Sequence, residues 1–343
     1  MQTPADYRSE LTIAGRAGRQ GLIGVAALIV IAIIPWFHSN YWISQLTFVA
    51  IYAIAGFGLQ ILLGFAGQVS LGQAAFLASG AYACSYVERL GFGSPAGFAA
   101  AVIVSTLLGL LVALPALRMA GLYLGIATMS FGFIIEEVAA RWSSVTGGNA
   151  GTVVAAIEVG GVSLGQPWQI YYLSWLFCLM VLLLSYNLLR TPTGRAMQAI
   201  RDSEIAARSS GVRVAQTKGI AFSLSAAFAG LAGALYSHAL GFISPEQFTI
   251  SMSLDLLVMI LIGGLGTLRG VLFGAVFLVV SPELMQAVLG MFTSGNTELP
   301  GLRPLLFGGS LILVLLFQPD GIDAMVSRTG AWLIRHAVSW RRR

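Results

Sequence analysis

The longest stretch without a charged residue constrains the fold of this chain most. Residues 20–87 contain no Asp, Glu, Lys or Arg, a run of 68 residues. A membrane-spanning helix needs about 20 consecutive apolar residues, so this run has room for about three passes. The whole chain of 343 residues is 57% apolar and 10% charged, which is too few charges to cover a soluble globule of that size. The sequence therefore predicts a polytopic membrane protein.

Further uncharged stretches continue this pattern toward the C-terminus. They are residues 90–117, 119–135, 159–189, 219–245, 256–268, 270–282 and 304–319. We expect an all-α integral membrane bundle of about ten transmembrane helices, within a range of about eight to eleven. Membrane β-strands alternate polar and apolar residues, whereas these stretches are apolar on all sides, so a barrel is disfavoured. No second soluble domain fits, and residues 1–343 are expected to form one transmembrane domain.

The basic residues predict the orientation of this bundle. The densest basic stretch, residues 190–218, is placed in the cytoplasm by the positive-inside rule. Alternating ten passes from there also places both termini, residues 1–20 and the basic tail 320–343, in the cytoplasm. Only Arg89, Arg141 and Arg303 then fall outside, which leaves 16 of the 19 Lys and Arg inside. The one sizeable outer loop is residues 141–169.

The sequence offers no catalytic machinery. A phosphate-binding P-loop needs a Gly-Lys-Ser/Thr run, but the only lysine, Lys218, follows Thr217 and precedes Gly219. The histidines are not spaced with a Cys or carboxylate as metal ligands would be, and we expect them at solvated interfaces. The cysteines lie inside apolar stretches and are expected to be packed thiols. These residues are His38, His238, His336, Cys84 and Cys178.

The basic stretch contains one segment that can form a helix. Residues 195–210 lack Gly and Pro, and on a single helix Arg201, Glu204 and Arg208 share a face, with Glu204 four residues before Arg208. The opposite face carries small residues: Ala196, Ala199, Ser203, Ala206 and Ser210. Small side chains permit close approach to another surface, which favours a docking helix for a cytoplasmic partner. A solvated helix lying on the membrane is the alternative.

Two Gly-rich segments interrupt the apolar stretches. They are GFAGQVSLGQ at 64–73 and GGLGTLRG at 263–270. Irregular backbone at membrane depth is tolerated where it is buried in protein or lines a cavity, and Gly-broken apolar segments often mark a transport site. Gln60, Gln68, Ser70 and Gln73 place polar groups near the first of these breaks. Small residues repeat every fourth position at 226–234 and at 266–274, which predicts tight helix packing.

Four ionisable residues fall within or beside apolar stretches: Glu136, Glu137, Asp255 and Glu283. Such residues usually face the bundle interior, although the first three lie near predicted helix ends, where water also explains them. A carrier driven by an ion gradient would need a central carboxylate or histidine. Asp255 and Glu283 are the candidates for that alternative. A membrane protein of assembly or sensing, without transport, is a third reading.

The chain resembles a known family in five motifs that occur in a fixed order. They are GFGLQILLGFAGQVSLGQAAFLASGAYACSYV, TGGNAG, GRAMQAIRDSEIAARSSGV, KGIAFSLSAAFAGLAGALY and GGLGTLRG. Over roughly residues 20–320 the chain is similar to the membrane permease subunits of bacterial ABC transporters for branched-chain amino acids, of the LivM type.

The resemblance implies a transport role in the bacterial inner membrane. Such a permease pairs with a second, homologous permease (the LivH type), with two cytoplasmic ATPase subunits and with a periplasmic binding protein that delivers leucine, isoleucine or valine. ATP and Mg are bound by the ATPases, so no cofactor is expected in this chain. Related permeases also handle urea and short amides, and this substrate class is the alternative within the family.

The resemblance also implies site residues. The cytoplasmic loop becomes the coupling helix, with Arg201, Asp202, Glu204, Ala206, Ala207 and Gly211. Family members carry Glu-Ala-Ala, three residues and then Gly; here Ile205 replaces the Glu and Glu204 stands one position early. The translocation path is expected near Gln68, Ser70, Gln73 and Asp255. Gln60 and Gln73 stand where Asn and His are expected, which implies a shifted specificity.

Overall fold

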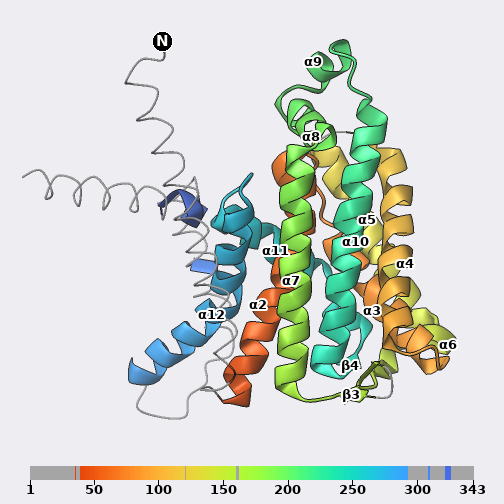
Figure 1. The fold of residues 1–343 in the computed structure, drawn as a ribbon, viewed down its shortest axis with the longest axis vertical. Coiled ribbons are helices and arrows are strands. Elements are labelled where there is room, and N and C mark those ends of the chain that lie inside the picture. The colour runs from red at the N-terminus through yellow and green to blue at the C-terminus, as the bar shows by residue number, and fades with distance from the viewer. Residues whose placement is uncertain are drawn as a thin grey trace, which may run out of the picture.

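The computed structural model describes residue 35 and residues 39–119, 121–159, 162–292, 308–309 and 321–325. Within these ranges the protein is a helical bundle with short strands at one end (Figure 1). The long helices are α2 (Asn40–Leu59), α3 (Gln73–Arg89), α4 (Ser94–Ala116), α5 (Leu122–Arg141), α7 (Pro167–Arg190), α10 (Val214–Leu240), α11 (Ile250–Gly263) and α12 (Leu268–Phe292). The π-helix η1 (Gln60–Phe65) extends α2.

The remaining elements connect these helices. Between α5 and α7 lie α6 (Ser143–Thr146), the 3-10 turn η2 (Gly148–Ala150), β1 (Thr152–Val153), β2 (Ile157–Val159) and β3 (Val162–Leu164). Between α7 and α10 lie α8 (Pro192–Asp202) and α9 (Glu204–Ser209), and between α10 and α11 lie β4 (Phe242–Ile243) and η3 (Pro245–Gln247). Strand β1 pairs with β4, and β2 pairs with β3, both antiparallel.

Six helices of the described part of the chain are long and apolar enough to cross a membrane: Asn40–Phe65, Ser94–Ala116, Leu122–Arg141, Pro167–Arg190, Val214–Leu240 and Pro245–Gly263. The prediction of a polytopic helical membrane protein is thereby confirmed. About ten passes stays a prediction, because most of the start of the first uncharged run (residues 20–36) and of the uncharged stretch 304–319 lies outside the described residues. The placement of both termini is untested for the same reason.

The core of the bundle is formed by α2, α3, α4 and α10, and glycines allow its helices to approach closely. A Cβ placed on Gly80 of α3 would lie 2.2 Å from the carbonyl oxygen of Gly230 on α10. A Cβ placed on Gly233 would lie 2.0 Å from the carbonyl oxygen of Leu77. These contacts confirm that the small-residue repeat at 226–234 is a packing stripe.

Two helices, α3 and α11, begin inside the bundle. Gln73, the first residue of α3, donates to the Ala55 carbonyl (3.4 Å) and accepts from the Ser225 hydroxyl (3.3 Å), groups in the interior of α2 and α10. The backbone N–H of Ala74 donates to the hydroxyl of Ser253, in the first turn of α11, at 2.9 Å. The N-termini of α3 and α11 therefore meet at depth in the bundle, as is typical of discontinuous transporter helices.

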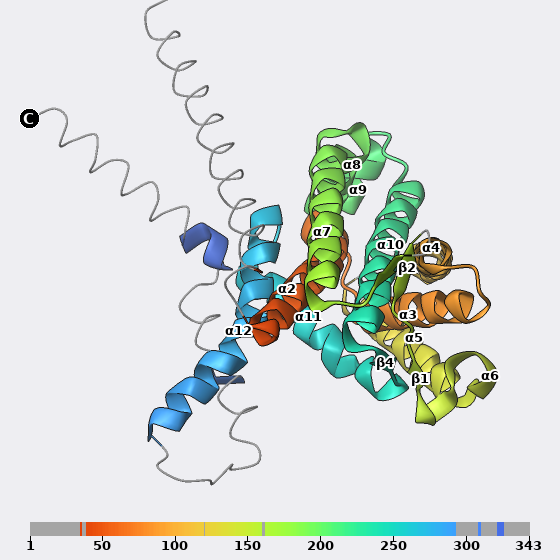
Figure 2. The same ribbon diagram turned by 60° about the horizontal axis from the view of Figure 1, so that its bottom comes forward.

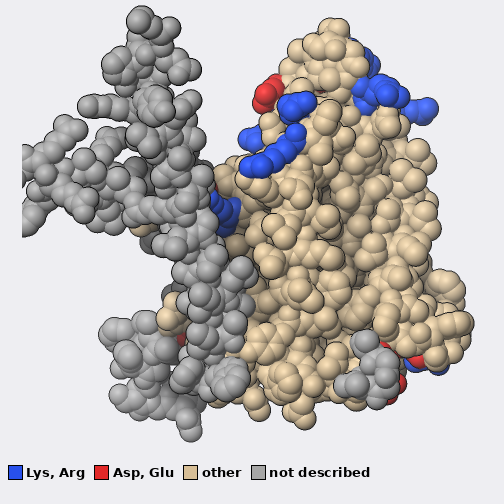
Figure 3. Space-filling model, viewed as in Figure 1, with Lys and Arg blue, Asp and Glu red and all other residues tan. Residues whose placement is uncertain are grey.

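Helices α8 and α9 lie at one end of the bundle, and the connection from α5 to α7, with α6 and the strands, lies at the opposite end (Figure 1 and Figure 2). At the α8–α9 end, the Lys218 ammonium lies 3.4 Å from the carbonyl of Ala116 at the end of α4. At the other end, which we call the strand end, the Arg89 guanidinium donates to the Val145 carbonyl. Lys and Arg gather around the α8–α9 end on the face in Figure 3. The structure therefore separates the basic loop from residues 141–169, as predicted, while the side of the membrane that each faces stays a prediction.

Candidate functional site

Both Gly-rich segments interrupt helices, as the sequence predicts. At the first break, α2 widens into the π-helix η1, residues 66–72 follow without regular structure, and α3 begins at Gln73. Short π-helical segments inside α-helices occur frequently at functional sites. At the second break, α11 ends at Gly263 and α12 begins at Leu268, with positive φ angles at Gly264 and Gly266.

The predicted path residues of the first break are buried. Gln60, Ser70 and Gln73 have no exposed surface, and Gln68 is 7% exposed. The amide nitrogen of Gln60 donates to the carbonyls of Gly264 (3.1 Å) and Thr267 (3.0 Å), which ties the first break to the second. The side-chain carbonyl oxygens of Gln60 and Gln68 have no partner within the described residues. The break therefore holds buried hydrogen-bond acceptors that remain to be satisfied.

The first break is also held by α5. The backbone N–H of Leu71 donates to the hydroxyl of Thr128 at 2.9 Å, and a Cβ on Gly72 would lie 2.5 Å from the Thr128 carbonyl oxygen. A gap of about 10 Å³, the space of roughly one water, lies between α5 and the N-termini of α3 and α11. It is lined by Leu71, Ala74, Met129, Gly132, Phe133, Phe248, Thr249, Ile250 and Ser253.

A wider recess lies beside this gap, toward the strand end. Its volume is about 750 Å³, and it shares Phe133 with the gap. Glu136, Asn149 and Glu246 contribute its polar groups, together with the ion pair between Glu137 and Arg141. The α5 residues that border the recess and the gap form a line from Arg141 at the strand end to Met129 beside the first break.

Asp255 lies away from this line. It lines another recess of about 390 Å³ between α2, α10, α11 and α12, together with Tyr52, Tyr236 and Glu283. Glu283 accepts a hydrogen bond from Gln45 at 3.4 Å. The two carboxylates that the sequence offered to an ion-driven carrier therefore share one recess, and Asp255 does not join Gln68, Ser70 and Gln73.

The predicted single loop helix is wrong, because Ser203 divides it. Ser203 has an extended backbone (φ −163°, ψ 114°), and its hydroxyl accepts from the N–H of Ala206 at 3.3 Å to cap α9. Serine is a preferred N-cap residue, so two short helices compete well with one long helix here. Ala196, Ala199, Ser203, Ala206 and Ser210 consequently do not form one face. Met197 and Ile200 form the buried side of α8 instead.

The loop is tied to the bundle through Glu204 and Ala207. Glu204 pairs with Arg208 at 3.7 Å, as predicted, and with Lys218 at 2.8 Å. The Lys218 side chain is 2% exposed, so this second pair joins α9 to the interior of the bundle. Ala207 is buried in a small apolar cluster with Ile200 and Val214. Ala207 therefore holds the loop together and presents no surface to a partner.

The outward face of α9 is marked by one large apolar side chain. Ile205 is 82% exposed, and Ala206 and Ser209 beside it are exposed as well. Gly211 follows in a left-handed conformation (φ 83°), which ends α9. Arg201 and Asp202 are exposed at the end of α8, where the Arg201 guanidinium donates to the Gly64 carbonyl of the first break.

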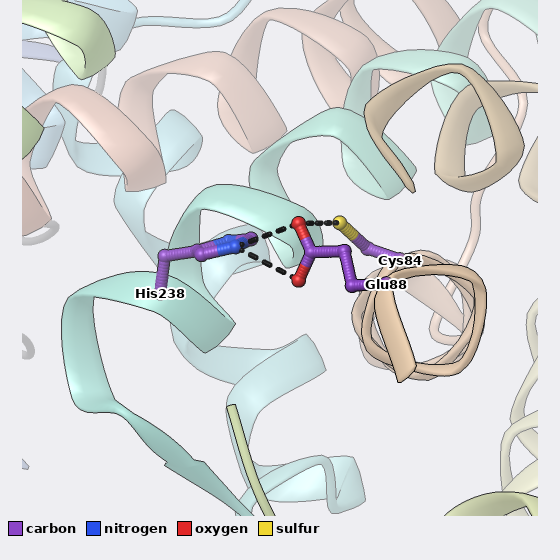
Figure 4. A group of neighbouring side chains, drawn as sticks. All are labelled: Cys84, Glu88 and His238. Carbon is purple, nitrogen blue, oxygen red and sulfur yellow. Dashed lines mark hydrogen bonds and ion pairs between the residues drawn. The ribbon is translucent and has the colours of Figure 1, made fainter. Parts of the chain in front are cut away.

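A cluster that the sequence did not predict joins α3 to α10 near the strand end (Figure 4). The Nε2 atom of His238 lies 3.0 and 3.1 Å from the two carboxylate oxygens of Glu88, and the Cys84 thiol lies 3.7 Å from one of them. The Nδ1 atom lies 2.7 Å from the Ala234 carbonyl, which only accepts, so Nδ1 carries a hydrogen. The Phe98 ring stacks on the imidazole.

These three side chains are the one group in the described part of the chain whose donor atoms could hold a metal ion. They already satisfy one another, since the thiol and the His238–Glu88 pair form a closed hydrogen-bond network. The pair is electrically neutral with the shared proton on either partner. We therefore read the cluster as a cross-link between helices.

The expectation of a solvated His238 is wrong. Its imidazole is buried against Glu88, which lies 150 positions earlier in the sequence, and against the Phe98 ring. Cys84 and Cys178 are buried and free, as predicted.

Comparison with known proteins places these features in a family. A family model described as "Branched-chain amino acid transport system / permease component" matches residues 41–315. The chain is 32% identical to the high-affinity branched-chain amino acid transport system permease protein LivM of Salmonella typhimurium, over 91% of this chain and 77% of that protein. LivM of Escherichia coli is 31% identical over the same shares.

More distant similarity extends to another solute. The autoinducer 2 import system permease protein LsrC of Escherichia coli is 24% identical over 74% of this chain and 75% of its own length. No solved structure matches. With a family model over most of its length and LivM relatives above 30% identity, this chain belongs to the permease components of branched-chain amino acid transport systems.

Proposed function

We propose that this chain is the membrane-spanning permease of an ATP-binding-cassette importer in the bacterial inner membrane, and that it carries leucine, isoleucine and valine. The LivM relatives support the transport role. The observation that carries the coupling role is the contact of the α8–α9 loop with the first Gly-rich break through Arg201. In this proposal residues 190–218 are the cytoplasmic coupling loop, in keeping with their positive charge.

The remaining subunits of the proposed importer are a second permease of the LivH type, two cytoplasmic ATPases and a periplasmic binding protein. ATP and Mg belong to the ATPases. The only lysine of this chain is buried beside Glu204, where it serves the packing of the loop. The energy for transport thus enters this chain as movement of α8 and α9.

The proposed solute path follows α5. A zwitterionic amino acid would enter the recess of Glu136, Asn149 and Glu246 at the strand end, where carboxylates favour its ammonium group. It would then pass the N-termini of α3 and α11, where the positive ends of the helix dipoles favour its carboxylate. Gln68, Ser70 and Gln73 line the last part of this path, in the first break. Asp255 is not part of it, because it lines a separate recess.

The proposed ATPase contact is the outward face of α9. An exposed apolar side chain surrounded by small residues can enter a groove on a partner, and Ile205 fits this description. Glu204, which is one position early relative to the family pattern, turns inward to Lys218 instead. Ala207 and Gly211 shape the loop, so changes at these two positions test the fold of the loop more than its docking.

The first experiment is to tag the chain, extract it gently from native membranes and identify what copurifies by mass spectrometry. Recovery of two ATPases and a second permease supports the importer, and uptake of leucine, valine and urea by the reconstituted complex then tests the substrate. Recovery of the chain alone, under conditions that preserve a control ABC complex, would contradict the proposal and favour an ion-driven carrier using Asp255 and Glu283.

The docking face is tested by Ile205→Asp, with Gln198→Asp on the exposed side of α8 as the matched control. A buried charge in a docking groove is costly, so we expect Ile205→Asp to lower ATPase recovery by at least about tenfold. Gln198→Asp adds the same charge away from α9 and should leave recovery unchanged. Equal ATPase recovery with both variants would contradict the proposal that α9 contacts the ATPase.

A further inference from the structure

Arg201 caps the end of the π-helix in the first break. Its guanidinium donates to the carbonyl of Gly64, the next-to-last residue of η1. Carbonyl groups in the last turn of a helix have no partner within the helix, and a positive charge is favourable there. A residue of the loop outside the bundle thus completes the hydrogen bonding of a broken helix inside it.

The backbone of Arg201 lies against the same break, and its tip lies against the second one. A Cβ placed on Gly67 would lie 3.2 Å from the Cα atom of Arg201. A Cβ placed on Gly266 would lie 2.8 Å from a guanidinium nitrogen of Arg201. Glycines at these two positions leave the space that Arg201 occupies, and one residue of α8 touches both breaks.

The two breaks are also joined to each other. Gln60, at the start of η1, donates to the carbonyls of Gly264 and Thr267, and the Thr267 hydroxyl reaches the Gly264 carbonyl at 3.2 Å. The last turn of α2–η1, the turn between α11 and α12, and the end of α8 therefore form one hydrogen-bonded unit. We call it the Arg201 junction.

We infer that Arg201 is the positioning residue that passes movement of the α8–α9 loop to both broken helices. This inference rests on the proposed function, in which the loop receives the movement of the ATPases. A planar guanidinium with five donors can hold a carbonyl and rest on a second backbone segment at once. A lysine has a single flexible ammonium and would reach only one of the two, so Arg201→Lys should retain part of the function.

The test uses the complete transporter, with both ATPases, in lipid nanodiscs and in vesicles. Arg201→Gln removes the junction, and Arg195→Gln removes the same charge from an exposed position on the same helix. Spin labels report movement relative to the strand end: one pair joins Gln198→Cys on α8 to Leu240→Cys at the end of α10, and another joins Leu265→Cys in the second break to Leu240→Cys. Cys84 and Cys178 are buried and leave the labelling selective.

We expect ATP binding to change both label distances in the parent protein and in Arg195→Gln. In Arg201→Gln the Gln198 distance should still change while the Leu265 distance stays fixed. The solute carried per ATP hydrolysed should fall at least about fivefold in Arg201→Gln and less in Arg201→Lys, within the range usual for coupled sites. A purely structural role for Arg201 would weaken both distance changes together.

Two other results have different meanings. If the Leu265 distance changes with ATP in Arg201→Gln as it does in the parent, the junction does not transmit the movement and the inference is overturned. If the Gln198 distance does not respond to ATP in the parent complex while hydrolysis proceeds, the loop does not couple, and the proposed function of residues 190–218 fails together with the inference.

Discussion

The bundle is cross-linked at both ends by an ionisable side chain, and the two cross-links are built differently. At the strand end, His238 and Glu88 join the regular helices α10 and α3, with side chains 1% and 7% exposed. At the α8–α9 end, Arg201 joins the loop helix α8 to the end of the π-helix η1, and Arg201 itself is exposed.

This difference in burial indicates which end of the bundle can move. A buried, neutral pair between close-packed helices is costly to separate, because each partner would lose its hydrogen bonds away from water. A guanidinium at the edge of water can exchange a protein carbonyl for solvent at little cost. The strand end is therefore expected to act as the fixed reference, and the α8–α9 end as the part that responds to a partner.

The largest expected effect comes from breaking the strand-end cross-link. Glu88→Ala leaves His238 and Cys84 buried without their acceptor, and we expect a loss of about 3–5 kcal/mol in the free energy of unfolding. Denaturant titration of the purified chain in a mild detergent measures this loss. A loss below about 1 kcal/mol would show that the cluster is not a rigid cross-link, and the comparison between the ends would lose its basis.

The double variant Glu88→Gln with His238→Gln is the control for this prediction. It replaces both partners by neutral side chains that can bond to each other, so its cost should be smaller than that of Glu88→Ala. A larger cost would mean that the shape of the imidazole against Phe98 matters more than the hydrogen bonds.

A smaller effect is expected from the helix contact next to this cross-link. Gly233→Ala places a methyl group 2.0 Å from the Leu77 carbonyl, so α3 and α10 must move apart. We expect a loss of about 1–3 kcal/mol, the usual cost of overpacking. Gly219→Ala, on the same helix near the α8–α9 end, has its nearest contact at 3.9 Å and is the matched control. Equal melting temperatures for both variants would contradict a tightly packed strand end.

The sequence predicted the breaks and the loop because their signals are local. Glycine runs such as 263–270 stand out in an apolar stretch, and Arg190 to Lys218 is the densest basic segment. The division of the loop at Ser203 also had a local signal, a preferred N-cap followed by an acidic residue, but a segment free of Gly and Pro reads as one helix. The two short helices also bury apolar residues in different clusters, with Met197 in the main core and Ala207 in the small cluster with Val214.

Contacts between distant segments could not be predicted in this way. His238 meets Glu88 across 150 residues, and Arg201 meets Gly64 across 137. Neither pair has a characteristic spacing, because the packing of α3 on α10 and of α8 on η1 brings the residues together. The sequence contains one partial signal: Glu88 ends the uncharged run 20–87, and a carboxylate that is buried needs a partner.

A third prediction concerns the loop. Glu204→Gln leaves the buried Lys218 without its carboxylate, and because Glu204 is one-third exposed we expect a local loss of about 1–2 kcal/mol. Hydrogen exchange of residues 203–218 should accelerate, while exchange in α3 stays unchanged. Arg208→Gln removes an exposed partner 3.7 Å from Glu204 and should change exchange little. Faster exchange throughout the bundle would mean that the two ends are not separate units.

The smallest effect is expected from the ion pair between Glu137 and Arg141, which lies at the strand end but is exposed, with side chains 59% and 81% accessible. Water screens such a pair and competes for both groups, so Glu137→Gln should change the free energy of unfolding by no more than about 0.5 kcal/mol. The measurement is the same titration that follows Glu88→Ala. Because both glutamates lie at one end of the bundle, a large loss for Glu137→Gln would mean that position, and not burial, decides which ionic contacts hold that end rigid.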